Sequence, residues 1–402
     1  MEKNSKSEIE KTLAPNCEFH ASKSLREKVL QTAEQKIATE KTVKLSAWKK
    51  TLATCAAAAA IIAIILVIKP GLTPLYAEDG IFTRAARLFN ETSGYTVTFD
   101  ARTLPNDNFS YVNASKPFVE HKMKVCSDGR WQLDKGSRIG EFDGENVYVW
   151  FPEEEWGWKL DASDGPGVLE QYELLRHIGD MMQWLENYAQ NHHDFTCRKS
   201  ETDSEIRLTI KAPAQGDFQN DYAKNSSIME TDTRQTYTFS KADGRLLSFK
   251  IDALFLGIPR TILKMKEINY NATISEADFI LPSGIEWIDE TDAYIAEMAM
   301  TFPIDQFIGI SPEKAAEKMF EALKTWDEAS LKVVMRGFPL SKMAAKYKGC
   351  TLIEHGEAFK SGLYDGVFVP CTIKFVDGST QKLKVTFITD NALGTWCADG
   401  GI

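Results

Sequence analysis

Residues 122–150, KMKVCSDGRWQLDKGSRIGEFDGENVYVW, contain three short runs of strand-forming residues. The runs lie at 122–125, 130–133 and 147–150, and the turn pairs are Asp128-Gly129 and Asp143-Gly144. Asp-Gly pairs favour the tight turns that connect antiparallel strands. The stretch therefore predicts an antiparallel meander.

The same pattern continues on both sides of this stretch. One strand is expected at 95–99, two more flank the turn Asp243-Gly244, and a further one is expected at 262–270. Between the two groups of strands lies a segment with apolar residues at helical spacing: Val168, Tyr172, Leu175, Met182, Leu185 and Ala189. Strands interrupted by one helix predict an α+β domain over residues 78–300, with the helix as a lid across one sheet.

A second, smaller domain is expected over residues 310–402. Ser311, Pro312 and Glu313 are typical of a helix start, because they supply a cap, a proline at the first helical position and an acid. Strands are then expected at 351–359, 367–376, 381–388 and 394–398. Helices followed by a curved sheet resemble the cystatin-like or NTF2-like fold, which would act as a binding or accessory module.

An uncharged run, TLATCAAAAAIIAIILVI, begins at Thr51 and ends at Ile68. Its 18 residues would form a helix about 27 Å long, which is enough to cross a membrane, although a buried Ala-rich helix is the alternative. Residues 1–50 carry many Lys and Arg, whereas Lys69 is the only basic residue between Ile68 and Arg84. The positive-inside rule therefore predicts a single span with a cytoplasmic N-terminus, and residues 69–77 as a linker to the outer domains.

Residues 1–50 contain one predicted helix. Ser24 and Glu27 fit a capping box, which places the helix start there. The apolar residues that recur every four positions after this start are Leu25, Val29, Ala33 and Ile37. They would form a stripe that docks on a partner, or else belong to a tether at the membrane surface.

Two resemblances extend these predictions. Glu18-Phe19 and residues 24–30, SLREKVL, followed by one span and a large outer region, resemble single-pass bacterial anti-sigma-factor-type regulators. That resemblance implies an RNA polymerase sigma factor as the partner of residues 1–50, in the bacterial inner (cytoplasmic) membrane. The zinc-associated His-x₃-Cys-x₂-Cys motif of many members is absent, since Cys17 and His20 are isolated.

The second resemblance concerns residues 78–300. Residues 142–150, FDGENVYVW, and residues 274–282, ISEADFILP, resemble the half-barrel of the LolA/LolB and RseB-like family. The family implies an incompletely closed sheet around an apolar cavity that accepts acyl chains or a lipidated segment. The candidates for lining such a cavity are Trp131, Trp150, Trp156, Trp158 and Trp184, and the alternative is that these rings fill a packed core.

Composition and motifs exclude several classes of function. The chain has 402 residues and a net charge of −10, which is the wrong sign for a nucleic-acid-binding face. It has no phosphate-binding loop, nucleophile elbow or zinc-protease motif, so neither an enzyme nor a cofactor is expected. Adjacent His192 and His193 point in different directions, so we expect no metal site. The five cysteines after the span permit at most two disulfides.

These observations predict a membrane-anchored sensor. Its outer domain would bind a lipid or apolar envelope ligand and signal to a cytoplasmic partner. The alternative is a tethered lipid or lipoprotein chaperone that does not signal.

Overall fold

The computed structural model describes residues 84–402, apart from 86, 87, 90, 110, 162–195, 219 and 303. The chain divides into two compact units, Met1–Thr51 and Leu52–Ile402, and all the described residues belong to the second. Several predicted features lie outside the described residues: the helix with Leu25, Val29, Ala33 and Ile37, the run from Thr51 to Ile68, the linker 69–77, and the helical segment 168–189 with Trp184.

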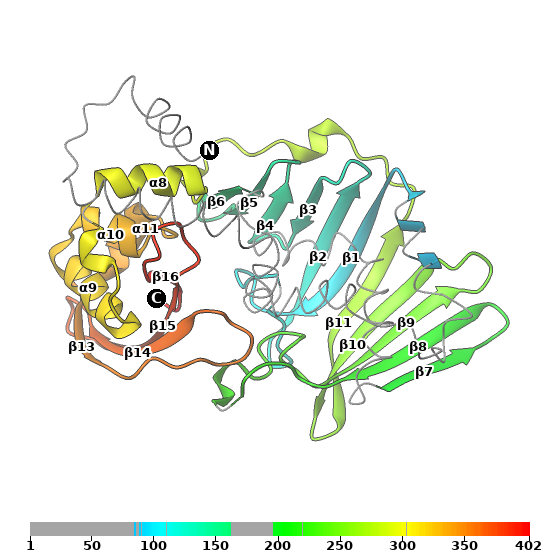
Figure 1. Ribbon diagram of the computed structural model, residues 1–402. Helices are drawn as coiled ribbons and strands as arrows, with labels where there is room; N and C mark the ends of the chain where they lie inside the picture. The colour runs from blue at the N-terminus through cyan, green and yellow to red at the C-terminus, as the bar shows by residue number, and fades with distance from the viewer. Residues whose placement is uncertain are drawn as a thin grey trace, which may run out of the picture. The chain divides into compact units, whose positions relative to one another are not determined.

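A twelve-stranded sheet dominates the described chain (Figure 1). Its strands are β1 (Gly94–Arg102), β2 (Phe118–Cys126), β3 (Trp131–Asp134), β4 (Ile139–Phe142), β5 (Asn146–Phe151), β6 (Trp156–Asp161), β7 (Thr196–Glu201), β8 (Glu205–Ala212), β9 (Thr233–Ser240), β10 (Leu246–Phe255), β11 (Ile258–Asn269) and β12 (Glu286–Asp289). They lie in the order β12-β6-β5-β4-β3-β2-β1-β11-β10-β9-β8-β7. All neighbours are antiparallel except β12 and β6, which are parallel. One meander from β1 to β6 therefore meets a second one at the β1–β11 ladder.

The meander predicted from residues 122–150 is confirmed. Its three runs form β2, β3 and β5, and the short strand β4 lies between the last two. Gly129 and Gly144 adopt φ values of 97° and 107°, a left-handed region that glycine enters without steric cost. The Asp-Gly turns therefore fold as the sequence indicates.

One face of this sheet is apolar. On β1 it carries Tyr95, Val97, Phe99 and Ala101, and the strand pairing continues the same face onto every neighbour. Its most deeply buried members include Met123, Trp131, Leu133, Val147, Val149, Ile210, Tyr237, Phe239 and Leu246. We call this surface the apolar face.

The C-terminal part contains four helices and a small sheet. They are α8 (Asp292–Thr301), α9 (Pro312–Thr325), α10 (Glu328–Val334) and α11 (Leu340–Tyr347), then β13 (Thr351–His355), β14 (Val367–Lys374), β15 (Thr380–Ile388) and β16 (Cys397–Gly400). The strands form an antiparallel sheet in chain order, and α9 buries Met319, Phe320 and Leu323 in a separate core. Short 3-10 helices lie at Asp221–Ala223, Glu276–Phe279 and Asp305–Phe307.

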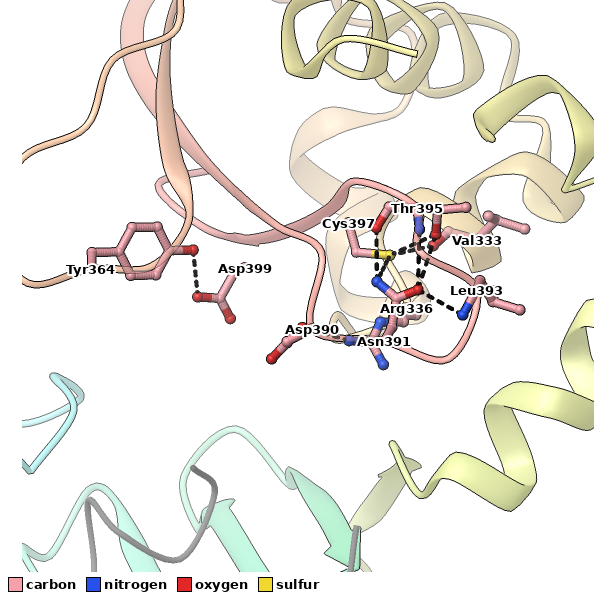
Figure 2. A network of polar contacts seen from close by, with 9 residues as sticks. All are labelled: Val333, Arg336, Tyr364, Asp390, Asn391, Leu393, Thr395, Cys397 and Asp399. Atoms are coloured by element: carbon pink, nitrogen blue, oxygen red, sulfur yellow. Dashed lines mark hydrogen bonds and ion pairs between the residues drawn. The ribbon is translucent and has the colours of Figure 1, made fainter. Parts of the chain in front are cut away.

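A polar network fixes the chain before β16 (Figure 2). The Asn391 side chain accepts hydrogen bonds from the backbone N–H groups of Leu393 and Thr395, and it donates to the Thr395 carbonyl at 2.7 Å. The Cys397 thiol donates to the Val333 carbonyl at 3.3 Å. Cys397 and the other described cysteines, Cys126, Cys197, Cys350 and Cys371, are free thiols, so the disulfides that the sequence permitted do not form among them.

The predicted fold class and location were wrong. The described chain is mostly β-sheet with four α-helices, rather than α+β with a membrane-spanning helix. Within the described residues no helix has the length and apolar character that a membrane crossing requires, and this finding overturns the predicted inner-membrane location. The fold class was misjudged because β4 and β12 have only four residues and β7 is mostly polar, so these strands lack the apolar runs that mark a strand.

Candidate functional site

Three basic side chains lie in a row across one end of the apolar face. Because Met123 pairs with Leu133, the next positions on the same face are His121 on β2 and Lys135 after β3. The Lys135 N–H donates to the Arg138 carbonyl at 3.0 Å, which pairs these two residues across the hairpin turn. We call His121, Lys135 and Arg138 the basic row.

The basic row is buried. His121 is 1% exposed, Lys135 is 4% exposed and Arg138 is 7% exposed. Lys and Arg side chains are almost never buried to this degree unless they are paired. The row is therefore the most unusual polar feature of the apolar face.

The loop between β1 and β2, residues 103–117, supplies the partners of Lys135. The Lys135 Nζ donates to the carbonyls of Leu104 at 3.1 Å and Asp107 at 2.9 Å, and lies 3.4 Å from the Thr103 hydroxyl. An ammonium has three N–H donors. All three of its donors are thus taken by the loop.

Arg138 is held differently. Its Nη1 donates to the Asn106 carbonyl at 3.4 Å, and its buried Nε has no hydrogen-bond partner among the described residues. Its guanidinium carbon lies 5.4–5.5 Å from the ring centres of Phe109, Phe151 and Trp158. These aromatic rings attract the positive charge of the guanidinium. They do not act as conventional hydrogen-bond acceptors for its N–H groups.

Burial shifts the pKa values of the other two members. The pKa of His121 is lowered to about 4, mainly by desolvation and then by the nearby Lys135, and its ring stacks on Phe99 at 4.8 Å. The pKa of Lys135 is lowered to about 7, mainly by desolvation and then by Arg138. Histidine is therefore neutral at pH 7, and Lys135 changes charge near neutral pH.

The arrangement places positive charge beside apolar side chains. Arg138 retains hydrogen-bond donors and its positive charge, and the residues beside the row on the same face are apolar and buried. Among the described residues no group of three or more His, Cys, Asp or Glu side chains could hold a metal ion. The Cys397 thiol is buried, which raises its pKa and disfavours the nucleophilic thiolate.

The predicted tryptophans do not form one cluster. Trp131 lies on the apolar face, as do Trp156 and Trp158 by the pairing of β5 with β6. Trp150 lies on the opposite face, 6.1 Å from the ring of Trp287. Gly157 permits this packing, because a Cβ there would lie 2.6 Å from the Trp150 Cβ. Trp184 lies outside the described residues.

Sequence reasoning missed the basic row. The signal was nevertheless present, since His121, Met123 and Val125 alternate along one strand, and Trp131, Leu133 and Lys135 alternate along the next. A basic residue at a strand position whose side chain lies on the apolar side indicates a buried basic group. Only the pairing of the strands shows that two such positions meet.

Comparisons with known proteins concern the fold alone. No family model and no curated protein matches the chain. Similar solved structures include an uncharacterized conserved protein from Thermus thermophilus, with 11% identity over 53% of this chain and 99% of that one and a TM-score of 0.31. A LolA superfamily protein from Nitrosomonas europaea has 10% identity, covers 50% and 96% of the two chains, and has a TM-score of 0.21. MucB in complex with MucA(peri) has 11% identity, covers 77% and 79%, and has a TM-score of 0.25.

Proposed function

We propose that the protein binds an amphiphile, either a lipid or the acylated end of a lipoprotein, on the apolar face of its twelve-stranded sheet. The observation that supports this is the juxtaposition of a broad apolar face with a buried basic row at one end of it. Burial of hydrocarbon contributes about 0.8 kcal/mol per methylene group, so an acyl chain supplies most of the affinity. The protein would act by binding and release, without catalysis.

The test is a titration of the full-length protein with a pyrene-labelled decanol, followed by fluorescence. We expect saturable binding with one probe per chain. Val97→Thr places a hydroxyl on the apolar face with almost no change in shape, and burying that hydroxyl weakens binding about tenfold.

Thr96 provides the matched control, because it is the neighbour of Val97 on β1 and faces the other side of the sheet. Thr96→Val is expected to bind the probe as the unchanged protein does. The proposal fails if the unchanged protein does not bind the probe, or if the two substitutions weaken binding equally.

A second proposal is that occupancy is signalled to a protein partner such as an RNA polymerase sigma factor. Its support is the four-residue spacing of Leu25, Val29, Ala33 and Ile37, which a partner could bind as one stripe. Residues 1–50 are used as bait with purified sigma factors, with Val29→Asp as the test variant and Glu34→Asp as the control off the stripe. Equal capture by all three baits, or none by any, would leave the binding protein without a signalling role.

A further inference from the structure

We infer that Arg138 binds the anionic end of the ligand, so that the ligand is an acyl chain ending in a carboxylate or a phosphate. The inference rests on the proposed function and names the chemistry of its ligand. The charged group would lie beside Arg138 in the basic row, and the chain along the apolar face.

Lys135 and Arg138 bring two basic groups close together. Lys135 and Arg138 are directly opposite each other on one face of a hairpin, an arrangement that is destabilising for like charges. Both are also removed from water, and Lys135 can lose its proton or rely on its three acceptors, whereas Arg138 stays charged. Among the described residues no carboxylate lies within 4.0 Å of either cation. Asp107 and Asp399 interact with them only at longer range.

Lys135 and Arg138 differ in the hydrogen-bond donors that they have left. Lys135 has no donor left, because the loop accepts all three. Arg138 has five N–H donors, of which one makes a long bond and Nε makes none to any part of the chain that the structure describes. A guanidinium presents its donors as a planar fork that fits a carboxylate or a phosphate. Arg138 is therefore the member of the row that can bind an anion.

The basic row adjoins the apolar residues of β2 and β3. The residues that follow the row along β2 and β3 on the same face are Met123 and Leu133, both fully buried among apolar side chains. A ligand whose charged group reaches the row would have its hydrocarbon next to these two residues, where it would replace the apolar side chains that now bury them. The three aromatic rings around Arg138 keep water away, which strengthens the charged hydrogen bonds.

The experiment compares four probes on the full-length protein: dodecanoate, dodecyl phosphate, dodecanol and inorganic phosphate. We expect the two anionic amphiphiles to bind at least about tenfold more tightly than dodecanol, since hydrogen bonds between charged groups are the stronger ones. Arg138→Gln is expected to remove this preference while dodecanol still binds.

Arg102→Gln is the matched control. Like Arg138, Arg102 lies over a phenylalanine ring and donates to a carbonyl of the loop 103–117, but it is on the opposite face of the sheet. We expect it to keep the preference for anions. Equal loss in both variants would mean that the arginines only fasten the loop, and would overturn the inference.

The remaining outcomes separate the two proposals. Equal affinity of the unchanged protein for dodecanoate and dodecanol overturns the anion site but leaves amphiphile binding in place. Inorganic phosphate that binds as tightly as dodecyl phosphate would mean that the site takes a free anion, and would also overturn the inference. Failure of all four probes to bind contradicts both proposals. None of these three outcomes depends on a variant that folds.

Discussion

At the scale of single residues, the buried basic row is where the sheet departs from an ordinary apolar core. His121 shows this most directly, because its ring is stacked on Phe99 and 1% exposed, and its pKa is lowered to about 4. Protonation of this ring would add a third cation beside Lys135 and Arg138. The folded protein therefore keeps His121 neutral and becomes less stable where the unfolded chain would protonate it.

The first prediction concerns acid stability. Above pH 6.5 His121 is neutral in both states, and as the pH falls toward 4 only the unfolded chain takes up its proton. His121 therefore makes its full contribution to the free energy of unfolding above pH 6.5. This contribution, about 3 kcal/mol, is lost as the pH falls toward 4. His121→Gln removes the titration, so its free energy of unfolding in urea should fall less between pH 7 and 4.5.

The interval from pH 7 to 8 is the control for this measurement. His121 is neutral in both states there, so the variant and the unchanged protein should differ by a constant amount. Parallel curves all the way from pH 8 to 4.5 would show that His121 is not kept neutral by burial.

At the scale of elements, local signals decided which predictions succeeded. The start of α9 was predicted from Ser311, Pro312 and Glu313, and it is confirmed: Ser311 is the N-cap, and its hydroxyl accepts from the Lys314 N–H at 3.3 Å. Such a cap satisfies one of the backbone donors that a helix start leaves free.

The second prediction tests this cap. Ser311→Ala should lower the free energy of unfolding by about 1 kcal/mol, because one N–H at the start of α9 loses its acceptor. Ser311→Asp should leave stability nearly unchanged, since aspartate caps a helix as well as serine does. Denaturant unfolding of both variants decides the matter, and equal stability of Ser311→Ala and the unchanged protein would contradict the capping role.

The elements that sequence could not predict share a physical cause. β3 and β5 were predicted because Asp-Gly turns and alternating apolar residues act locally. β12 was missed because its partner is β6, far away in sequence, and no local pattern encodes a parallel ladder. The basic row was missed for the same reason, because His121 and Lys135 meet only through the β2–β3 register.

At the scale of the whole molecule, the described chain is held by packing and hydrogen bonds, with no disulfide among its cysteines. All five described cysteines are free, and Cys350, Cys371 and Cys397 lie in the core of the C-terminal part. Burial raises the pKa of Cys350 to about 11 and that of Cys371 to about 12, so these thiols are inert while the protein is folded.

The third prediction follows from this thiol content. Protein denatured without reductant should release at least the five described thiols to a thiol-specific chromophore, and prior reduction should give all seven cysteines of the chain. In the native protein Cys350, Cys371 and Cys397 should react slowly, because these three thiols are buried and burial raises their pKa values. A count below five in the unreduced, denatured sample would contradict the free state of these cysteines.

The β1–β11 ladder also affects the order in which the strands of the sheet can pair during folding. Every other antiparallel contact in the sheet joins strands that follow one another in the chain, whereas this ladder joins Ala101 to Leu263. Hairpins close quickly, but a contact between distant segments must first overcome the entropy of a long loop. The two meanders can therefore form early and separately, whereas their joining at β1 and β11, like the pairing of β12 with β6, is expected to come later.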